Sequence, residues 1–129
     1  EHAMIVMNKY PYSNGHLMVV PYLHTDIPTA LDDDALLEMI KLVNDSITVL
    51  REALHADGFN VGMNLGASAG AGIEHHIHMH IVPRWTGDTN FMSVLSDTRV
   101  ICEALDESSR RLKPHFDAIA AERHAQKED

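Results

Sequence analysis

Basic residues and cysteine are scarce in this chain. Ten Lys and Arg side chains stand against 19 Asp and Glu, which gives a net charge of −9, whereas a surface that binds a nucleic acid backbone is basic. We therefore expect no nucleic-acid partner, although backbone amides and a few His or Arg side chains can still bind a small anion. Cys102 is the single cysteine, which excludes an internal disulfide and fits the cytoplasmic location that we expect.

Long apolar runs are also absent. No stretch approaches the run of about 18 apolar residues that a membrane span needs, so we expect no membrane contact. The chain has 129 residues, 45% of them hydrophobic, which predicts a single domain over residues 1–129. The sequence opens on Glu1 and enters strand-like sequence at once, so we expect further residues upstream.

Histidine, in contrast, is abundant, with ten residues. Three of them alternate with apolar residues in the segment 76–82, which reads His-Ile-His-Met-His-Ile-Val. Successive side chains of a strand point to opposite faces, so His76, His78 and His80 share one face at spacings of about 6.6 Å. The intervening apolar side chains face the other way, toward a core.

Four short apolar segments bounded by turn-forming residues predict strands, at residues 4–7, 16–21, 59–65 and 76–82. One apolar stripe at spacings of three and four predicts a long helix between the second and third strands, and it comprises Leu36, Ile40, Val43, Ile47, Leu50 and Leu54. Asp32, Asp33 and Asp34 suit the start of this helix, and Gly58 suits its end.

A second helix is predicted from Asp97, with Pro114 ending or kinking it. A short helical piece over residues 116–121 and a frayed tail would follow. The order of strands, helix, strands and helix predicts an α+β fold with an antiparallel sheet and helices on one face.

The row of histidines allows three interpretations. The histidines could simply face solvent, or they could bind zinc, for which imidazole is a common ligand. In the third interpretation one imidazole is a nucleophile and its neighbours bind the phosphate under attack. The loop 66–72 contains only small residues, which let backbone amides approach phosphate oxygens. We therefore favour the phosphate chemistry over zinc.

The segment 76–82 resembles the H-φ-H-φ-H-φ-φ signature of the histidine triad (HIT) superfamily. The resemblance extends over about residues 4–115. It includes Asn8, Gly15-His16-Leu17-Met18-Val19, Pro21, His24, Asn64, Ala69-Gly70, Pro83-Arg84-Trp85, Gly87-Asp88 and Asn90-Phe91. The sequence is most similar to the branch of Fhit-like hydrolases and diadenosine tetraphosphate phosphorylases.

The resemblance implies a HIT-like α+β fold, a homodimer and a nucleotide substrate. His78 would be the nucleophile that attacks the α-phosphorus, flanked by His76 and His80, with His16 as a fourth histidine. His80 would also contact the substrate. The other implied substrate contacts are Asn8 and Asn64, toward the ribose and α-phosphate, and the backbone amides of Gly70, Ala71, Gly72 and Ile73.

Two departures from the family pattern affect what the resemblance implies. The segment Ala71-Gly72-Ile73-Glu74-His75 lacks the glutamine of Fhit-like enzymes and is one residue longer, as on the phosphorylase side. The N-terminal Cys-x-x-Cys pair of zinc-binding members does not occur in these 129 residues, so structural zinc is not supported unless upstream residues supply the pair. His24 is expected to be a structural or surface residue. We expect no required cofactor, although a divalent cation could accompany the nucleotide.

From these observations we predict a hydrolase that cleaves dinucleoside polyphosphates through a covalent nucleotidyl intermediate on His78. The alternatives are a phosphorylase of the same compounds, an adenosine phosphoramidase, and, outside enzymes, a nucleotide-binding regulatory protein. Arg84 and Trp85 are expected to pack at the strand end. The sequence leaves open whether Asn90 and Phe91 cover the site or a dimer partner's site.

Overall fold

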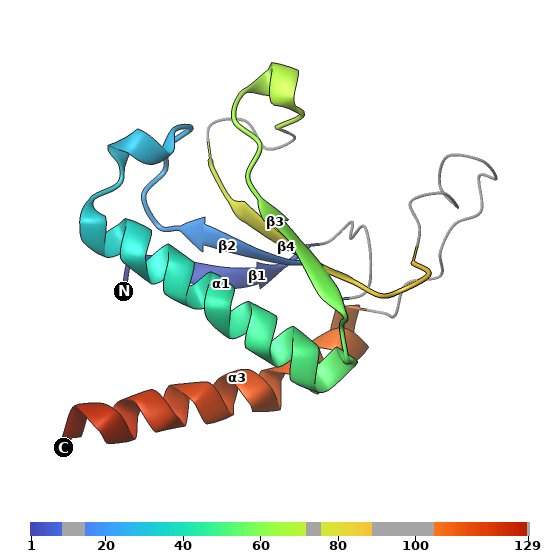
Figure 1. The fold of residues 1–129 in the computed structure, drawn as a ribbon. Helices are drawn as coiled ribbons and strands as arrows, with labels where there is room; N and C mark the ends of the chain where they lie inside the picture. Colours follow the sequence, from blue (N-terminus) through green and yellow to red (C-terminus); the bar gives the residue numbers. More distant parts are fainter. Residues whose placement is uncertain (9–14, 72–75, 89–104, 129) are drawn as a thin grey trace.

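Over the described residues, the fold is a four-stranded antiparallel sheet with two α-helices on one face (Figure 1). This computed structural model describes residues 1–8, 15–71, 76–88 and 105–128. The elements are β1 (Ala3–Met7), β2 (Leu17–Pro21), η1 (Pro28–Ala30), α1 (Asp33–Leu54), β3 (Gly58–Gly62), η2 (Ala67–Ala69), β4 (Met79–Arg84) and α3 (Leu105–Glu128). The strand order is β1-β2-β4-β3, and each neighbouring pair is antiparallel. The structure thus confirms the predicted α+β fold with an antiparallel sheet.

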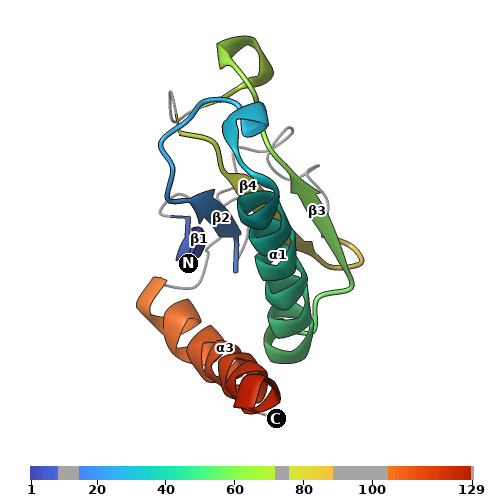
Figure 2. The ribbon, with the colours of Figure 1, turned by 90° about the vertical axis from the view of Figure 1, so that its left-hand side faces the viewer.

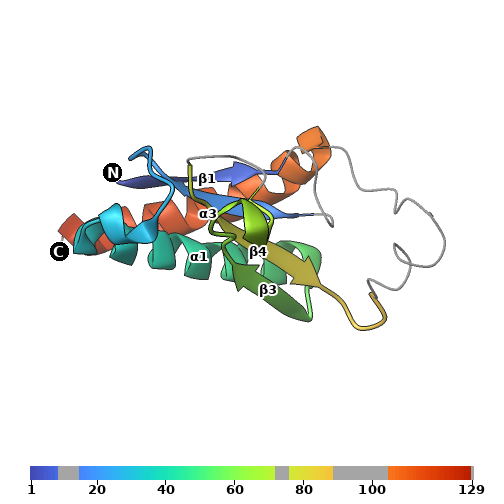
Figure 3. The same cartoon turned by 90° about the horizontal axis from the view of Figure 1, so that it is seen from above.

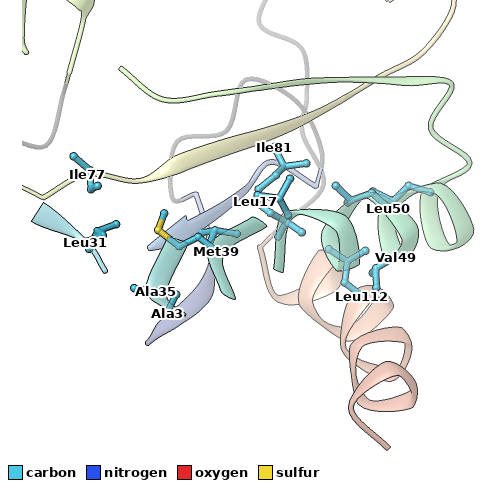
Figure 4. Close-up of a cluster of buried hydrophobic side chains, with 13 residues drawn as sticks. Ala3, Leu17, Leu31, Ala35, Met39, Val49, Leu50, Ile77, Ile81 and Leu112 are labelled. Carbon is cyan, nitrogen blue, oxygen red and sulfur yellow. The ribbon is translucent and has the colours of Figure 1, made fainter. Parts of the chain in front are cut away.

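The core lies between the sheet and α1, with α3 beside α1 (Figures 2 and 3). Figure 4 shows Leu17 and Ile81 from the sheet close to Leu50 of α1 and Leu112 of α3. Leu17, Leu50 and Ile81 are at most 1% exposed. Burying one such side chain stabilises the fold by about 1.5–3 kcal/mol, so these contacts hold α1 against β2 and β4.

Helix α1 begins where the acidic triplet predicted and ends earlier than expected. Asp32 is the N-cap, and its side chain accepts a hydrogen bond from the Ala35 N–H at 2.8 Å. His55, with φ of 53°, occupies the left-handed position at the C-terminus. The prediction that Gly58 ends this helix is wrong, since Gly58 is the first residue of β3.

The apolar stripe of α1 agrees with the prediction at Val43, Leu50 and Leu54, which are buried, and differs from it in the first turns of the helix. Ala35, Met39 and Val43 are buried, whereas Leu36 and Ile40 are 39% and 49% exposed. A helical repeat of 3.6 residues allows neighbouring stripes when apolar residues are plentiful, and the position of the sheet selects which one is covered.

Strands β1 and β2 begin within one residue of the prediction, whereas β3 and β4 differ from it by three residues at one end. β3 ends at Gly62 rather than at residue 65. The histidine segment enters the sheet only at Met79, which pairs with Val19, and β4 then runs to Arg84. Strand pairing, which the sequence does not reveal, decides where a ladder starts.

Helix α3 continues through Pro114 to Glu128, so Pro114 does not end it, and the predicted piece 116–121 and the tail belong to the same helix. A proline inside a helix loses one hydrogen bond and costs about 3 kcal/mol. Leu112 is buried in the core and Phe116 packs against it, so packing on both sides of Pro114 offsets this cost. Arg123 also pairs with Asp45 of α1 at 2.5 Å. The predicted start at Asp97 lies outside the described residues. Within the described ranges, no helix is long and apolar enough to cross a membrane.

Candidate active site

One face of the sheet brings together residues from three neighbouring strands. Asn8 follows β1, His16 precedes β2, and His80 lies in β4. Leu17 pairs with Ile81 and both are buried in the core. His16 and His80, one position before each of them, therefore share the opposite face.

A chain of side-chain hydrogen bonds connects these three residues. Asn8 Nδ2 lies 3.2 Å from His16 Nδ1, and His16 Nε2 lies 2.8 Å from His80 Nδ1. The Asn8 N–H also donates to the His16 carbonyl at 3.0 Å, which fixes the backbone of the two residues relative to each other. The fourth histidine of the prediction thus lies against the third one of the row.

His78 is oriented by the backbone of its own segment. Its Nδ1 lies 3.1 Å from the carbonyl oxygen of His76, and because a carbonyl only accepts, Nδ1 carries the proton. In the neutral imidazole the lone pair is then on Nε2. The ring of His78 packs edge-on against His80, with 4.7 Å between centroids and 72° between planes.

His76 contacts the end of β2 and the connector that follows it. Its Nε2 donates to the Pro21 carbonyl at 2.8 Å, and its ring stacks on His24 with 5.0 Å between centroids. The Ile77 N–H donates to the Thr25 carbonyl at 2.8 Å. The connector after β2 therefore positions the first part of the histidine row, and sequence reasoning gave Thr25 no such role because only the tertiary pairing reveals it.

The described residues do not make a complete metal site. No three His, Cys, Asp or Glu side chains among them are grouped to hold an ion. His24 and His76 supply two imidazoles, and Nε2 of His76 is already bonded to Pro21. Zinc in structural sites takes four protein ligands, so the described residues do not form a structural zinc site.

Burial and neighbouring charge act on two of the histidines. Burial, then His80 and His78, lower the pKa of His16 from 6.5 to about 4, consistent with an imidazole that is 1% exposed. Burial and His78 also lower the pKa of His80. Both rings are therefore neutral at pH 7, and their hydrogen-bond roles depend on which nitrogen carries the single proton.

The predicted phosphate loop has a defined turn in its described part. Asn64 is exposed in the segment after β3, and Gly70 has φ of 86° at the end of η2. The N–H of Gly70 donates to Ala67 and that of Ala71 to Gly66, at 3.0 and 3.3 Å. These two amides therefore already donate inside the turn. Gly72 and Ile73 lie outside the described residues.

Arg84 and Trp85 pack and pair at the strand end. Arg84 donates to Asp88 at 2.9 Å and to Asn60 at 2.7 Å, and Trp85 Nε1 donates to the Leu54 carbonyl at 3.1 Å. The packing interpretation of both residues accounts for these contacts. Asn90 and Phe91 fall outside the described residues.

Comparison with known proteins agrees with this fold. The model of the HIT domain family matches residues 1–87. An AP-4-A phosphorylase of Mycobacterium tuberculosis is 42% identical over 107 residues, 83% of this chain and 55% of that protein. An adenylylsulfatase of Arabidopsis thaliana is 33% identical over 64% of this chain and 41% of its own length. The chain thus spans about half the length of these two relatives.

A solved structure covers nearly the whole chain. A Zn-bound histidine triad family protein from Mycobacterium smegmatis superimposes with a TM-score of 0.75 at 30% identity, over 94% of this chain and 82% of that one.

Proposed function

The chain belongs to the HIT family, and we propose that it cleaves dinucleoside polyphosphates of the diadenosine tetraphosphate type, with inorganic phosphate as the acceptor. The similarity to the M. tuberculosis phosphorylase supports this choice of substrate and acceptor. So does the longer segment before the histidine row, which lacks a glutamine. Hydrolysis, which the sequence led us to predict first, becomes the second candidate.

The observation that carries the proposal is the hydrogen bond from His78 Nδ1 to the His76 carbonyl. It holds the ring with the lone pair on Nε2, which is the requirement for a nucleophilic imidazole. We assign the nucleophilic role to His78 for this reason.

The reaction would proceed in two displacements at the same phosphorus. In the first, Nε2 of His78 forms a P–N bond to the α-phosphorus of diadenosine tetraphosphate, and the bond to the bridging oxygen breaks to release ATP. In the second, an oxygen of inorganic phosphate attacks the same phosphorus, the P–N bond breaks, and ADP leaves with the imidazole restored. Water in place of phosphate would give AMP.

His80 would stabilise the charge that develops during both steps. A donor aimed at a phosphate oxygen in a site with little water contributes more in the transition state than in the ground state. His80 lies edge-on to His78 at 4.7 Å between centroids, within reach of a phosphorus bonded to His78. His76, held by Pro21, would keep the carbonyl that orients His78 in place.

The other candidate functions bind the same α-phosphate and differ in the leaving group or in whether a covalent bond forms. An adenosine phosphoramidase would release an amine in place of ATP, and the similarity to an adenylylsulfatase supports testing adenosine phosphosulfate as well. A nucleotide-binding regulatory protein would bind without forming the P–N bond.

Product analysis separates these functions. Pure protein is incubated with diadenosine tetraphosphate, with and without inorganic phosphate, and the nucleotides are separated by chromatography. We expect ADP and ATP only when phosphate is present. AMP and ATP without phosphate would replace the proposal by hydrolysis. Nucleotide binding without turnover of any of these substrates would favour the regulatory protein.

Metal and partner requirements remain predictions. We expect turnover to persist after zinc is removed by a chelator and dialysis. We expect any divalent cation that takes part to be bound to the nucleotide and not to the protein. Retention of full activity in EDTA would exclude that cation as well. The homodimer and the cytoplasmic location also remain predictions.

A further inference from the structure

We propose that Asn8 is a positioning residue which acts through His16 to fix the tautomer of His80, so that Nε2 of His80 carries the N–H. This inference rests on the proposed function for its catalytic meaning, because the N–H would be the group that meets a phosphate oxygen. The tautomer itself can be observed without turnover.

The first step is the contact between the amide of Asn8 and the imidazole of His16. Asn8 Nδ2 lies 3.2 Å from His16 Nδ1. An amide NH₂ group only donates, so Nδ1 of His16 must accept through its lone pair. The proton of a neutral His16 is then on Nε2.

The second step transfers this preference to His80. His16 is 1% exposed, and burial keeps its pKa well below 7, so it has a single ring proton at neutral pH. That proton, on Nε2, donates across 2.8 Å to Nδ1 of His80. Nδ1 of His80 therefore accepts, and the proton of a neutral His80 must be on Nε2.

The third step is the consequence for phosphate chemistry. With Nε2 protonated, His80 presents a donor to an anionic oxygen. In the opposite tautomer it would present a lone pair, which repels the same oxygen and removes the stabilisation. The electrostatic interaction of His80 with this phosphate oxygen is thus attractive in one tautomer and repulsive in the other.

An isosteric change at Asn8 can reverse this preference. In Asn8→Asp a carboxylate only accepts, so His16 must place its proton on Nδ1. Nε2 of His16 then accepts, and His80 donates from Nδ1 and presents a lone pair at Nε2. Asn44→Asp is the matched control, because the Asn44 side chain is exposed on α1 and the chemical change is identical.

The experiment is two-bond ¹H–¹⁵N correlation NMR of the imidazole nitrogens at pH 8.5, where an adjacent carboxylate would still leave His16 neutral. We expect protonated Nε2 on His16 and His80 in the wild type and in Asn44→Asp, and protonated Nδ1 on both in Asn8→Asp. Protonated Nδ1 in the wild type, or unchanged tautomers in Asn8→Asp, would overturn the inference. Should Asn8→Asp fold poorly, Asn8→Ala is the second variant, and we expect it to lower the share of protonated Nε2 on His16 relative to the wild type. An unchanged share would also overturn the inference.

Kinetics separate a positioning role from a direct substrate contact. We expect Asn8→Asp to lower kcat at least on the order of tenfold, as loss of a donor to a developing charge does, with a smaller change in KM. A raised KM with unchanged kcat and tautomers would show that Asn8 contacts only the ribose and would refute the inference. Wild-type tautomers as expected, together with no turnover of any substrate, would reject the proposed function and leave the hydrogen-bond chain intact.

Discussion

Gly15 lies directly on the side chain of Leu54, the last residue of α1. A Cβ at Gly15 would lie 2.6 Å from Leu54 Cδ1 and 2.9 Å from Leu50 Cδ2, and the residue has φ of 75°. The chain therefore passes close over the helix immediately before His16. The position of a site histidine thus depends on the absence of a side chain one residue earlier.

We expect Gly15→Ala to lower the free energy of unfolding by about 1–3 kcal/mol more than Gly66→Ala does, because overpacking adds to the strain of positive φ. Gly66 has a similar φ of 81° but open space around it, so it reports the strain alone. Urea unfolding of both variants is the measurement. Equal losses would show that Leu50 and Leu54 move aside without cost.

His78→Ala is expected to abolish turnover, by on the order of 10³-fold or more, as loss of a nucleophile does. Nucleotide binding, measured by calorimetry, should persist because the neighbouring histidines remain. His115→Ala is the control, since His115 lies on α3 beside Glu52. Residual turnover within tenfold of the wild type would show that another residue is the nucleophile.

Stability should fall on acidification because His16 is neutral in the folded protein. Its pKa is about 4 when folded against 6.5 when unfolded, so the unfolded state binds more protons between these values. The free energy of unfolding therefore decreases as pH falls from about 6.5 to 4, by about 1.4 kcal/mol per unit at most. The lowered pKa of His80 adds in the same direction.

Urea unfolding at pH 7 and pH 4.5 tests this dependence. The difference between the two pH values should be smaller in His16→Gln than in the wild type, whatever the stability of the variant at pH 7. Asn44→Ala, which replaces an exposed side chain that does not titrate, should keep the wild-type difference. An unchanged difference in His16→Gln would mean that His16 is not the group responsible.

Removal of the Asp32 cap of α1 should lower the free energy of unfolding more than removal of the neighbouring Asp33 carboxylate does. Asp32 accepts from the Ala35 N–H at 2.8 Å, and loss of such a cap costs about 1 kcal/mol. Asp33 is exposed in the first turn, so Asp33→Ala should lose only the dipole interaction, about 0.3–1 kcal/mol. Thermal unfolding of Asp32→Ala and Asp33→Ala compares them, and a larger loss for Asp33→Ala would contradict the capping role.

In the predicted homodimer, a second copy of the chain could cover the exposed apolar residues of α1. Leu36 and Ile40 belong to the stripe predicted for the core but are 39% and 49% exposed. If a second copy covers this stripe, Ile40→Glu should shift the sedimentation coefficient from that of a dimer to that of a monomer. Lys41→Glu is the exposed control. A dimer unaffected by Ile40→Glu would place the interface elsewhere.

The sequence by itself determined the class of fold and the identity of the central histidines. Period-two alternation over residues 76–82 predicted three imidazoles opposite a row of apolar residues, and the structure places the segment from Met79 onward in β4. The acidic triplet located the start of α1 because free amides at a helix start attract carboxylates. These features are set by residues close together in the sequence, so local sequence patterns predict them.

Only the tertiary structure decided how the histidines are connected. The 2.8 Å contact between His16 and His80 joins residues 64 positions apart, and it follows from the pairing of β2 with β4. The same holds for the bond from His76 to Pro21 and for the continuation of α3 through Pro114. Strand register and helix packing set these contacts because their energies come from distant parts of the chain, which no local pattern encodes.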